Sequence, residues 1–318
     1  MTRHDFVPVL TTLLLLAVSA PGAATAAAAQ PPGASASLSK VTIESARQRQ
    51  ALRQRVNRFV DAVVDQGGNQ SLVRWNQPMC PLVAGLPRDY GEFILARISQ
   101  AARAAGAPLA GRTCRANLFV IASARPDLVL KKWLARDPQI ETPNGIAHMH
   151  EFLASTQPVR VWYNTVHSCD GAVSSGGVAA AGLNATMADS NPSGSLGPSY
   201  CQNTMDTHLS YGDVRSIYSA IVIVDTGRLT HVTIGQLADY VSLVGLVNVR
   251  AGTDGEGAPT ILRLFRDPRA PQALTPWDRA LLYSLYNTNQ SGKLQLVDME
   301  SAMVARIAPS SGFQALPP

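Results

Sequence analysis

The sequence predicts an α+β protein in which a mixed sheet packs on helices, with an amphipathic helix preceding the main domain. Short β-rich runs alternate with longer segments of helical periodicity, and no segment is repeated. The 318 residues are 46% hydrophobic with 27 basic and 22 acidic side chains, a composition that excludes a disordered or collagen-like chain. The basic residues are spread over most of the chain without a focused stripe, so we expect no nucleic-acid partner.

The first residues predict export. A short polar start precedes an apolar run over residues 6–20, and small side chains end at Ala26 or Ala29, which is the pattern of a signal peptide over residues 1–29. This run is shorter than the roughly 20 residues that span a bilayer, and no later segment is apolar enough, so we expect no transmembrane segment. The mature protein is therefore expected in the periplasm or outside the cell.

Four cysteines are expected to form disulfides, because an exported chain meets an oxidising environment. Three pairings are open, and none of the pairs has the close spacing of a zinc or redox motif. We favour the sequential pairing because each bridge then closes a loop of similar, moderate length. The predicted pairs are Cys80 with Cys114 and Cys169 with Cys201.

Residues 30–67 are expected to hold a linker that ends near Lys40 and a helix that stops at Gly67. Apolar side chains recur at helical spacing at Leu52, Val56, Phe59 and Val63. The rest of the helix surface is basic and almost free of acidic residues, and it could bind anionic lipid or a polyanion; an ordinary solvated face is the alternative. Its arginines are Arg47, Arg49, Arg53, Arg55 and Arg58.

Residues 68–308 are predicted to form the main domain, with residues 309–318 as a tail. Pro87 is expected to open a helix that Gly106 ends, residues 117–123 to form a strand, and Pro126 to start a short helix. Alternation over 159–164 predicts a half-buried strand, with Val159, Val161 and Tyr163 on one face and Arg160, Trp162 and Asn164 on the other. A long Gly/Ser/Asn loop over 169–213 precedes a strongly apolar strand at 217–225.

Three further helices are predicted beyond this strand. Thr233 and Gln236 form a capping-box pair, and Gly245 stands where that helix should end. An apolar turn, APTIL, leads to a helix that Thr275 caps with Pro276 at its first position. A last helix is expected over 296–307.

This order of elements resembles the zincin metalloprotease fold, in particular its metzincin-like members and related secreted bacterial proteins. The likeness is sharpest over 237–286, where the family carries HExxHxxGxxH, two histidines on one helical face and a third beyond a glycine turn. When this sequence is aligned with the family motif on the glycine, it has the helix but lacks the histidine ligands. The degenerate positions are Ala238, Asp239, Ser242, Gly245 and Asn248.

The resemblance implies a metal-free, catalytically inactive relative, so no cofactor is expected. Leu262 stands where metzincins place a methionine beneath the metal, and LTPWDRALLYSLY resembles the helix that follows it in the family. Asp239, Ser242 and Asn248 would form the floor of the old cleft, with the 169–213 loop as a wall. The implied partner is a peptide, or another envelope protein, paired with the edge strand beside the cleft.

Two other functions remain open at this stage. A metal-dependent peptidase could use a displaced site at His148 and His150, with His167 or His208 as third ligand. An envelope-associated structural protein could bind anionic surfaces through the Arg-rich helix. A third pattern, the calcium-loop spacing from Asn287 to Asp298, has a single carboxylate, so a helix-to-helix turn at Gly292 is favoured there.

Overall fold

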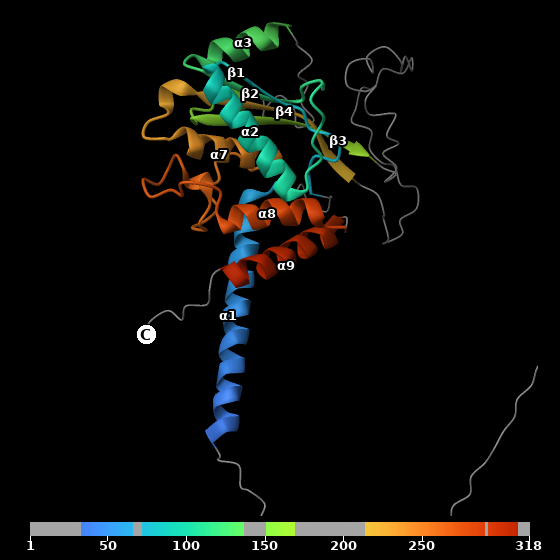
Figure 1. The fold of residues 1–318 in the computed structure, drawn as a ribbon, viewed down its shortest axis with the longest axis vertical. Coiled ribbons are helices and arrows are strands. Elements are labelled where there is room, and N and C mark those ends of the chain that lie inside the picture. Colours follow the sequence, from blue (N-terminus) through green and yellow to red (C-terminus); the bar gives the residue numbers. More distant parts are fainter. Residues whose placement is uncertain (1–32, 66–71, 137–150, 169–213, 290–291, 311–318) are drawn as a thin grey trace, which may run out of the picture. The chain divides into compact units, whose positions relative to one another are not determined.

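The structure is a computed structural model that describes residues 33–65, 72–136, 151–168, 214–289 and 292–310 (Figure 1). The chain divides into two compact units, residues 1–45 and residues 46–318. Its elements are α1 (Gly33–Val63), β1 (Pro81–Ala84), α2 (Arg88–Ala105), β2 (Leu118–Ser123), α3 (Pro126–Arg136), β3 (Val159–Ser168), β4 (Val214–Asp225), η1 (Thr226–Arg228), α7 (Ile234–Leu246), η2 (Ile261–Arg263), α8 (Pro276–Asn287) and α9 (Gly292–Ser310).

The four strands form one mixed sheet in the order β1-β2-β4-β3. β1 pairs in parallel with β2 and β2 in parallel with β4, whereas β3 runs antiparallel to β4. The connection from β1 to β2 passes through α2, as parallel strands require a crossover. The predicted α+β class is therefore confirmed.

The sheet is covered on both faces. Its larger core lies on the face where α2 contacts β1 and α7 contacts β4, and a smaller cluster of Leu130, Trp162, Ile221 and Ile223 lies on the α3 face. The prediction that β3 is half-buried is wrong for this reason. The side chains on the face predicted to be exposed, Arg160, Trp162 and Asn164, are all buried, whereas Val161 and Tyr163 on the other face are only partly buried.

Arg160 explains how a charged residue fits on this buried face. Its guanidinium donates to the carbonyl oxygen of Leu153 at 3.0 Å, in the helical turn at 151–154. A second nitrogen lies 3.2 Å from the Asp127 carboxylate of α3. A buried arginine is tolerated only with such partners, so β3 is fixed to two segments that cover it.

Helix α1 differs from its prediction at its N-terminal end. It begins at Gly33, within the segment expected to be a linker, and ends at Val63. Val56, Phe59 and Val63 are buried in the main core, and the Phe59 ring packs edge-on against Trp277 at 5.4 Å. The second half of α1 therefore belongs to the compact unit of residues 46–318, whereas the sequence predicted a boundary after residue 67.

The local signals at other helix ends are confirmed. Pro87 precedes α2, and Gly106 ends it in the left-handed conformation at φ 81°. Thr275 caps α8 in a complete capping box with Asp278, and Pro276 is its first residue. α9 begins at Gly292 instead of near residue 296.

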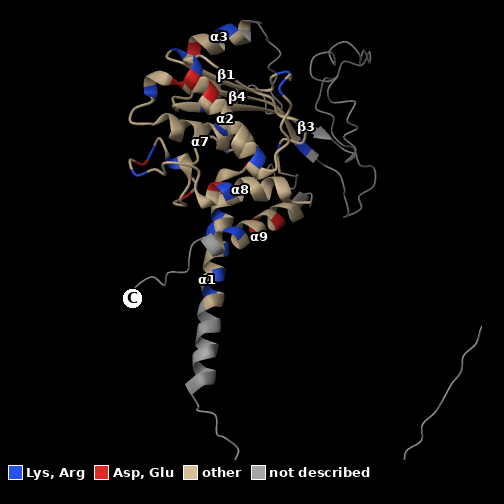
Figure 2. Ribbon diagram, in the orientation of Figure 1, with Lys and Arg blue, Asp and Glu red and all other residues tan. Residues whose placement is uncertain are grey.

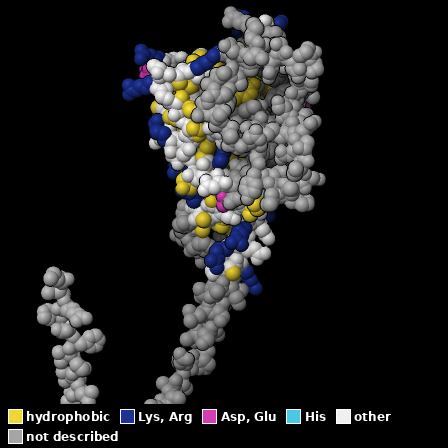
Figure 3. Space-filling view, turned by 90° about the vertical axis from the view of Figure 1, so that its right-hand side faces the viewer, with side chains coloured by type: hydrophobic (Ala, Val, Ile, Leu, Met, Phe, Trp, Pro, Cys, Tyr) yellow, Lys and Arg dark blue, Asp and Glu magenta, His cyan; other side chains and the backbone are white. Residues whose placement is uncertain are grey.

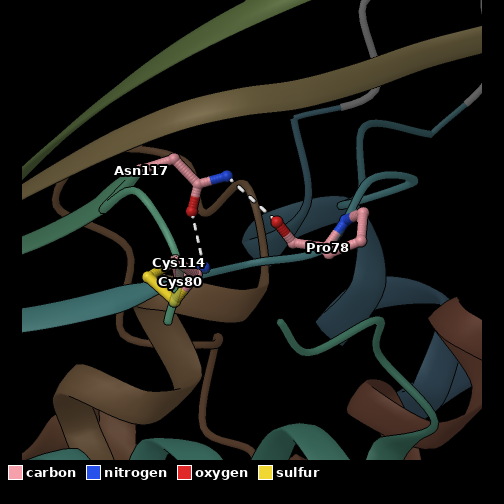
Figure 4. The surroundings of a disulfide bond; sticks show 4 residues. All are labelled: Pro78, Cys80, Cys114 and Asn117. Atoms are coloured by element: carbon pink, nitrogen blue, oxygen red, sulfur yellow. Dashed lines mark hydrogen bonds between the residues drawn. A yellow bond between two sulfur atoms is a disulfide. The ribbon is translucent and has the colours of Figure 1, made fainter. Parts of the chain in front are cut away.

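The predicted disulfide between Cys80 and Cys114 is present and ties the start of β1 to the loop before β2 (Figure 4). Asn117 reinforces it, because its side-chain oxygen accepts from the Cys80 amide at 2.7 Å while its nitrogen donates to the Pro78 carbonyl at 3.2 Å. The predicted partners Cys169 and Cys201 lie outside the described residues. Among the described helices, none has the length and apolar character needed to cross a membrane.

Candidate functional site

The candidate site is built on α7, the helix that follows β4. η1 turns the chain at the end of β4, and the capping box of Thr233 and Gln236 starts α7 as the sequence predicted. The Gln236 side chain also donates to the Pro271 carbonyl at 3.2 Å, which joins the start of α7 to the segment before α8. Since α7 is buried on nearly every side, its position is fixed by packing against α2 and β4.

Gly245 does not end the helix in the way that the sequence predicted. It lies in the last turn of α7, which continues to Leu246 and is capped by the extended residue Val247. A Cβ atom at Gly245 would stand 3.2 Å from a methyl carbon of Leu118 in β2. The absence of a side chain at Gly245 thus allows α7 to approach the sheet closely, and the residue does not form a left-handed turn.

The residues predicted for a cleft floor are closed off from solvent. Asp239, Ser242 and Asn248 are 2%, 0% and 7% exposed, and Ala238 is fully buried beside them. The Ser242 hydroxyl donates back to the Ala238 carbonyl at 2.6 Å, within the helix. The predicted open floor of Asp239, Ser242 and Asn248 is therefore not observed, because α2 and the segment before α8 cover this side of α7.

Asp239 has two partners inside the protein. One oxygen lies 2.7 Å from Arg97 Nε of α2, an ion pair whose approach is too oblique for a straight hydrogen bond. The other oxygen accepts from the Leu274 amide at 2.8 Å. The Asp239 carboxylate thus connects α7 to α2 and to the segment leading into α8.

This arrangement predicts a structural role for Asp239 that stability measurements can test. Arg97→Met should lower the free energy of unfolding by about 2 kcal/mol, because it leaves a buried carboxylate without its counter-charge; Arg97 is itself one-third exposed, which moderates the effect. Adding Asp239→Asn to Arg97→Met should recover most of that loss. Urea titration of the two single variants and the double variant measures both effects, and additive losses would contradict the pairing.

The C-terminal carbonyl groups of α7 are satisfied by three aromatic side chains from distant segments. Trp75 donates from its indole nitrogen to Gly245 at 2.8 Å, Tyr286 from its hydroxyl to Leu246 at 2.6 Å, and Tyr163 from its hydroxyl to Val244 at 2.6 Å. Burial raises the pKa of both tyrosine hydroxyls above the ordinary value, so they remain proton donors.

Tyr163 connects β3 directly to this helix end. Its hydroxyl also lies 2.8 Å from the Val247 carbonyl and accepts from the Val249 amide at 3.3 Å. The sequence did not predict these three caps. The sequence could have indicated them, because no polar side chain caps the end of this helix. Its last carbonyl groups therefore need donors from other segments.

Asp278 organises the segment between α7 and α8. It is fully buried and accepts from the Thr260 hydroxyl, the Ile261 amide and both the amide and the hydroxyl of Thr275. Leu262 is buried in η2 just after this network. Asp278 is thus a hydrogen-bond centre that fixes this turn on α8.

The described residues contain no group of three His, Cys, Asp or Glu side chains that could hold a metal ion. His148, His150 and His208 of the displaced metal site lie outside the described part of the chain, and His167 lies on β3. In the segment with calcium-loop spacing, Asn287 donates to the carbonyl groups of Ala105 and Tyr283, and Asp298 accepts from Thr288. Both end residues of that loop therefore have partners within the protein.

No protein-family model, curated protein or solved structure matches this chain.

Proposed function

We propose that this is an exported, zincin-like binding module without a catalytic metal, which holds an extended peptide along the outer edge of β3. The sheet order is the observation that carries the proposal. An antiparallel edge strand lies beside β4, and β4 leads directly into α7, the helix whose sequence resembles the zincin metal-binding helix. This is the arrangement in which an edge strand borders a peptide cleft.

The outer edge of β3 offers the backbone groups that such pairing needs. The Asp225 amide donates to the Pro158 carbonyl, so residue 158 belongs to a hydrogen-bonded pair with β4. Antiparallel pairs alternate, and the register places Val159, Val161 and Tyr163 at the positions in between. Their amide and carbonyl groups therefore point away from β4, and no described strand pairs with that edge.

The chemistry of α7 supports binding in preference to catalysis. Ala238, Ser242 and Asn248 are poor metal ligands in the places of the family's histidines, and Asp239 is bound to Arg97 and the Leu274 amide. Without a metal-bound water, a carboxylate at this position has no activated nucleophile to serve. Main-chain pairing requires neither metal nor base.

The cellular setting is part of the same proposal. A disulfide that closes a loop of 34 residues is typical of proteins that fold in an oxidising compartment. Together with the N-terminal pattern, this supports a place in the periplasm or outside the cell. The expected partner is an unfolded or extended segment of an envelope protein.

A proline at Val161 tests the proposed pairing. Val161→Pro removes an amide that points outward while leaving the hydrogen bonds to β4, so the fold should persist and peptide binding should fall at least tenfold. The probe is a fluorescein-labelled library of random decapeptides, followed by fluorescence anisotropy with and without a chelator. Val161→Thr is the matched control and should bind as the wild type does.

Three outcomes would overturn this function. They are a wild-type protein that binds no decapeptide, a Val161→Pro variant that binds as tightly as Val161→Thr, and a loss of binding in chelator. Cleavage of the decapeptides that stops in chelator would instead establish the metal-dependent peptidase. A thermal midpoint within a few degrees of the wild type confirms that Val161→Pro is folded.

A further inference from the structure

We propose that the described part of α1 is a docking surface for anionic phospholipid, held to the bilayer by charge alone. The surface consists of the side chains of Arg47, Arg49, Arg53, Arg55 and Arg58, and all five are exposed. Figure 2 shows basic residues on the described stretch of α1, and the space-filling view of Figure 3 shows dark-blue side chains close to where the grey part of the helix begins. This inference is independent of peptide binding at β3.

The net positive charge of the chain equals the charge of these five arginines. The chain has 27 basic and 22 acidic side chains, so removing these five arginines leaves 22 of each and a formal charge of zero. Residues 46–60 contain no acidic side chain at all. Among the described residues, none of the five guanidinium groups forms an ion pair with a carboxylate, so their charge is available to an anionic partner.

Packing fixes the direction in which these arginines point. The apolar side of the same helix is buried in the main core, through Val56, Phe59, Val60 and Val63. The helix therefore cannot rotate to turn the exposed arginines into the interior. The guanidinium of Arg55 lies over the Trp277 ring at 5.2 Å, which anchors the helix to α8 as well. The arginines are therefore presented by a rigid support.

The same packing decides the mode of binding. A typical interfacial helix inserts its apolar face among the lipid chains, but here that face is occupied by the core. Adhesion must then come from the arginines and anionic head groups, each basic side chain strengthening binding by about fivefold. Binding of this kind is reversible, and it weakens as salt shortens the Debye length. A bilayer fits this chain better than a nucleic acid, because the protein is expected outside the cytoplasm.

Vesicle sedimentation tests this surface with a charge-matched control. The probe is a vesicle of phosphatidylcholine with about one-third phosphatidylglycerol, compared with pure phosphatidylcholine. One variant changes Arg47, Arg49, Arg53, Arg55 and Arg58 to Gln. The control variant changes five exposed arginines elsewhere to Gln, namely Arg103, Arg112, Arg115, Arg125 and Arg269.

We expect the wild type and the control variant to sediment with the anionic vesicles, within about threefold of each other, and to be released by salt. The α1 variant should bind at least tenfold more weakly, with unchanged decapeptide binding and a thermal midpoint lowered by no more than a few degrees, since it loses the contact of Arg55 with Trp277. Equal losses in both variants, or binding to pure phosphatidylcholine, would overturn the proposal. So would a wild type that binds DNA but leaves the vesicles in the supernatant, because the partner would then be a soluble polyanion.

Discussion

Asp278→Ala is expected to lower the free energy of unfolding by about 4 kcal/mol. The carboxylate is fully buried and accepts four hydrogen bonds, from Thr260, Ile261 and Thr275. Its removal leaves the donors without partners in the interior, opens a cavity and deletes the capping box of α8. Urea titration followed by tryptophan fluorescence measures the loss.

Thr260→Val is the matched control for this network. It keeps the side-chain volume but removes one of the four donors and the hydroxyl that accepts from the Leu262 amide, so it should cost about 2 kcal/mol. If Asp278→Ala cost no more than Thr260→Val, the carboxylate would not be the centre of the network. The comparison thus distinguishes the contribution of the Asp278 carboxylate from that of a single residue in the turn.

The same residue predicts a dependence on pH. Burial raises the pKa of the Asp278 carboxyl above its ordinary value, although its hydrogen bonds oppose the shift. A raised pKa means that the folded protein binds this proton more tightly than the unfolded chain does. The part of the stability that depends on this proton is therefore complete below the ordinary pKa of about 3.9, and it is lost as the pH rises through the raised pKa.

Unfolding of the wild type and of Asp278→Asn over a range of pH tests the sign. The asparagine does not titrate, so the difference in unfolding free energy, wild type minus variant, should fall as the pH rises from about 3 to about 7. A difference that grows with pH would mean that the hydrogen bonds outweigh burial. Both proteins share every other titrating group, so the contributions of those groups cancel in the difference between the two unfolding free energies.

Replacing both cysteines of the observed disulfide is expected to have an effect of similar size. The bridge closes a loop of 34 residues, and the chain-entropy relation gives about 4 kcal/mol for a loop of this length. The Cys80→Ser/Cys114→Ser variant should therefore unfold at clearly lower urea than the oxidised wild type. Asn117 retains its bonds to Cys80 and Pro78 in this variant, so β1 should still form.

Reductant is the control for the disulfide. It should lower the stability of the wild type to that of the double serine variant or below. Any further loss when reductant is added to the variant would report the predicted bridge between Cys169 and Cys201, which lies outside the described residues. An oxidised wild type no more stable than the variant would contradict the prediction.

Several features could be read from the sequence because their causes are local. A proline before a helix, a glycine after it, or a threonine with a polar partner three residues on acts within one turn of the chain. Pro87, Gly106, Thr233 and Thr275 all lie where those rules place them. The pairing of Cys80 with Cys114 was predicted from the expected compartment and the spacing of the cysteines, and it is confirmed.

The candidate site was only partly predictable. The sequence located α7, but the prediction placed Asp239, Ser242 and Asn248 on an open floor. Their burial depends on α2 and the segment before α8, which meet α7 from elsewhere in the chain. Gly245 was read as a turn residue, although its role is the contact with Leu118.

The sequence alone therefore determined the class of fold, several helix ends, one disulfide and a group of arginines on one helix. Only the tertiary structure decided which groups satisfy one another. Trp75 and Gly245 are 170 residues apart, and Arg97 and Asp239 belong to different helices. A buried polar group needs a partner wherever the fold brings one, and sequence spacing contains no information about that partner.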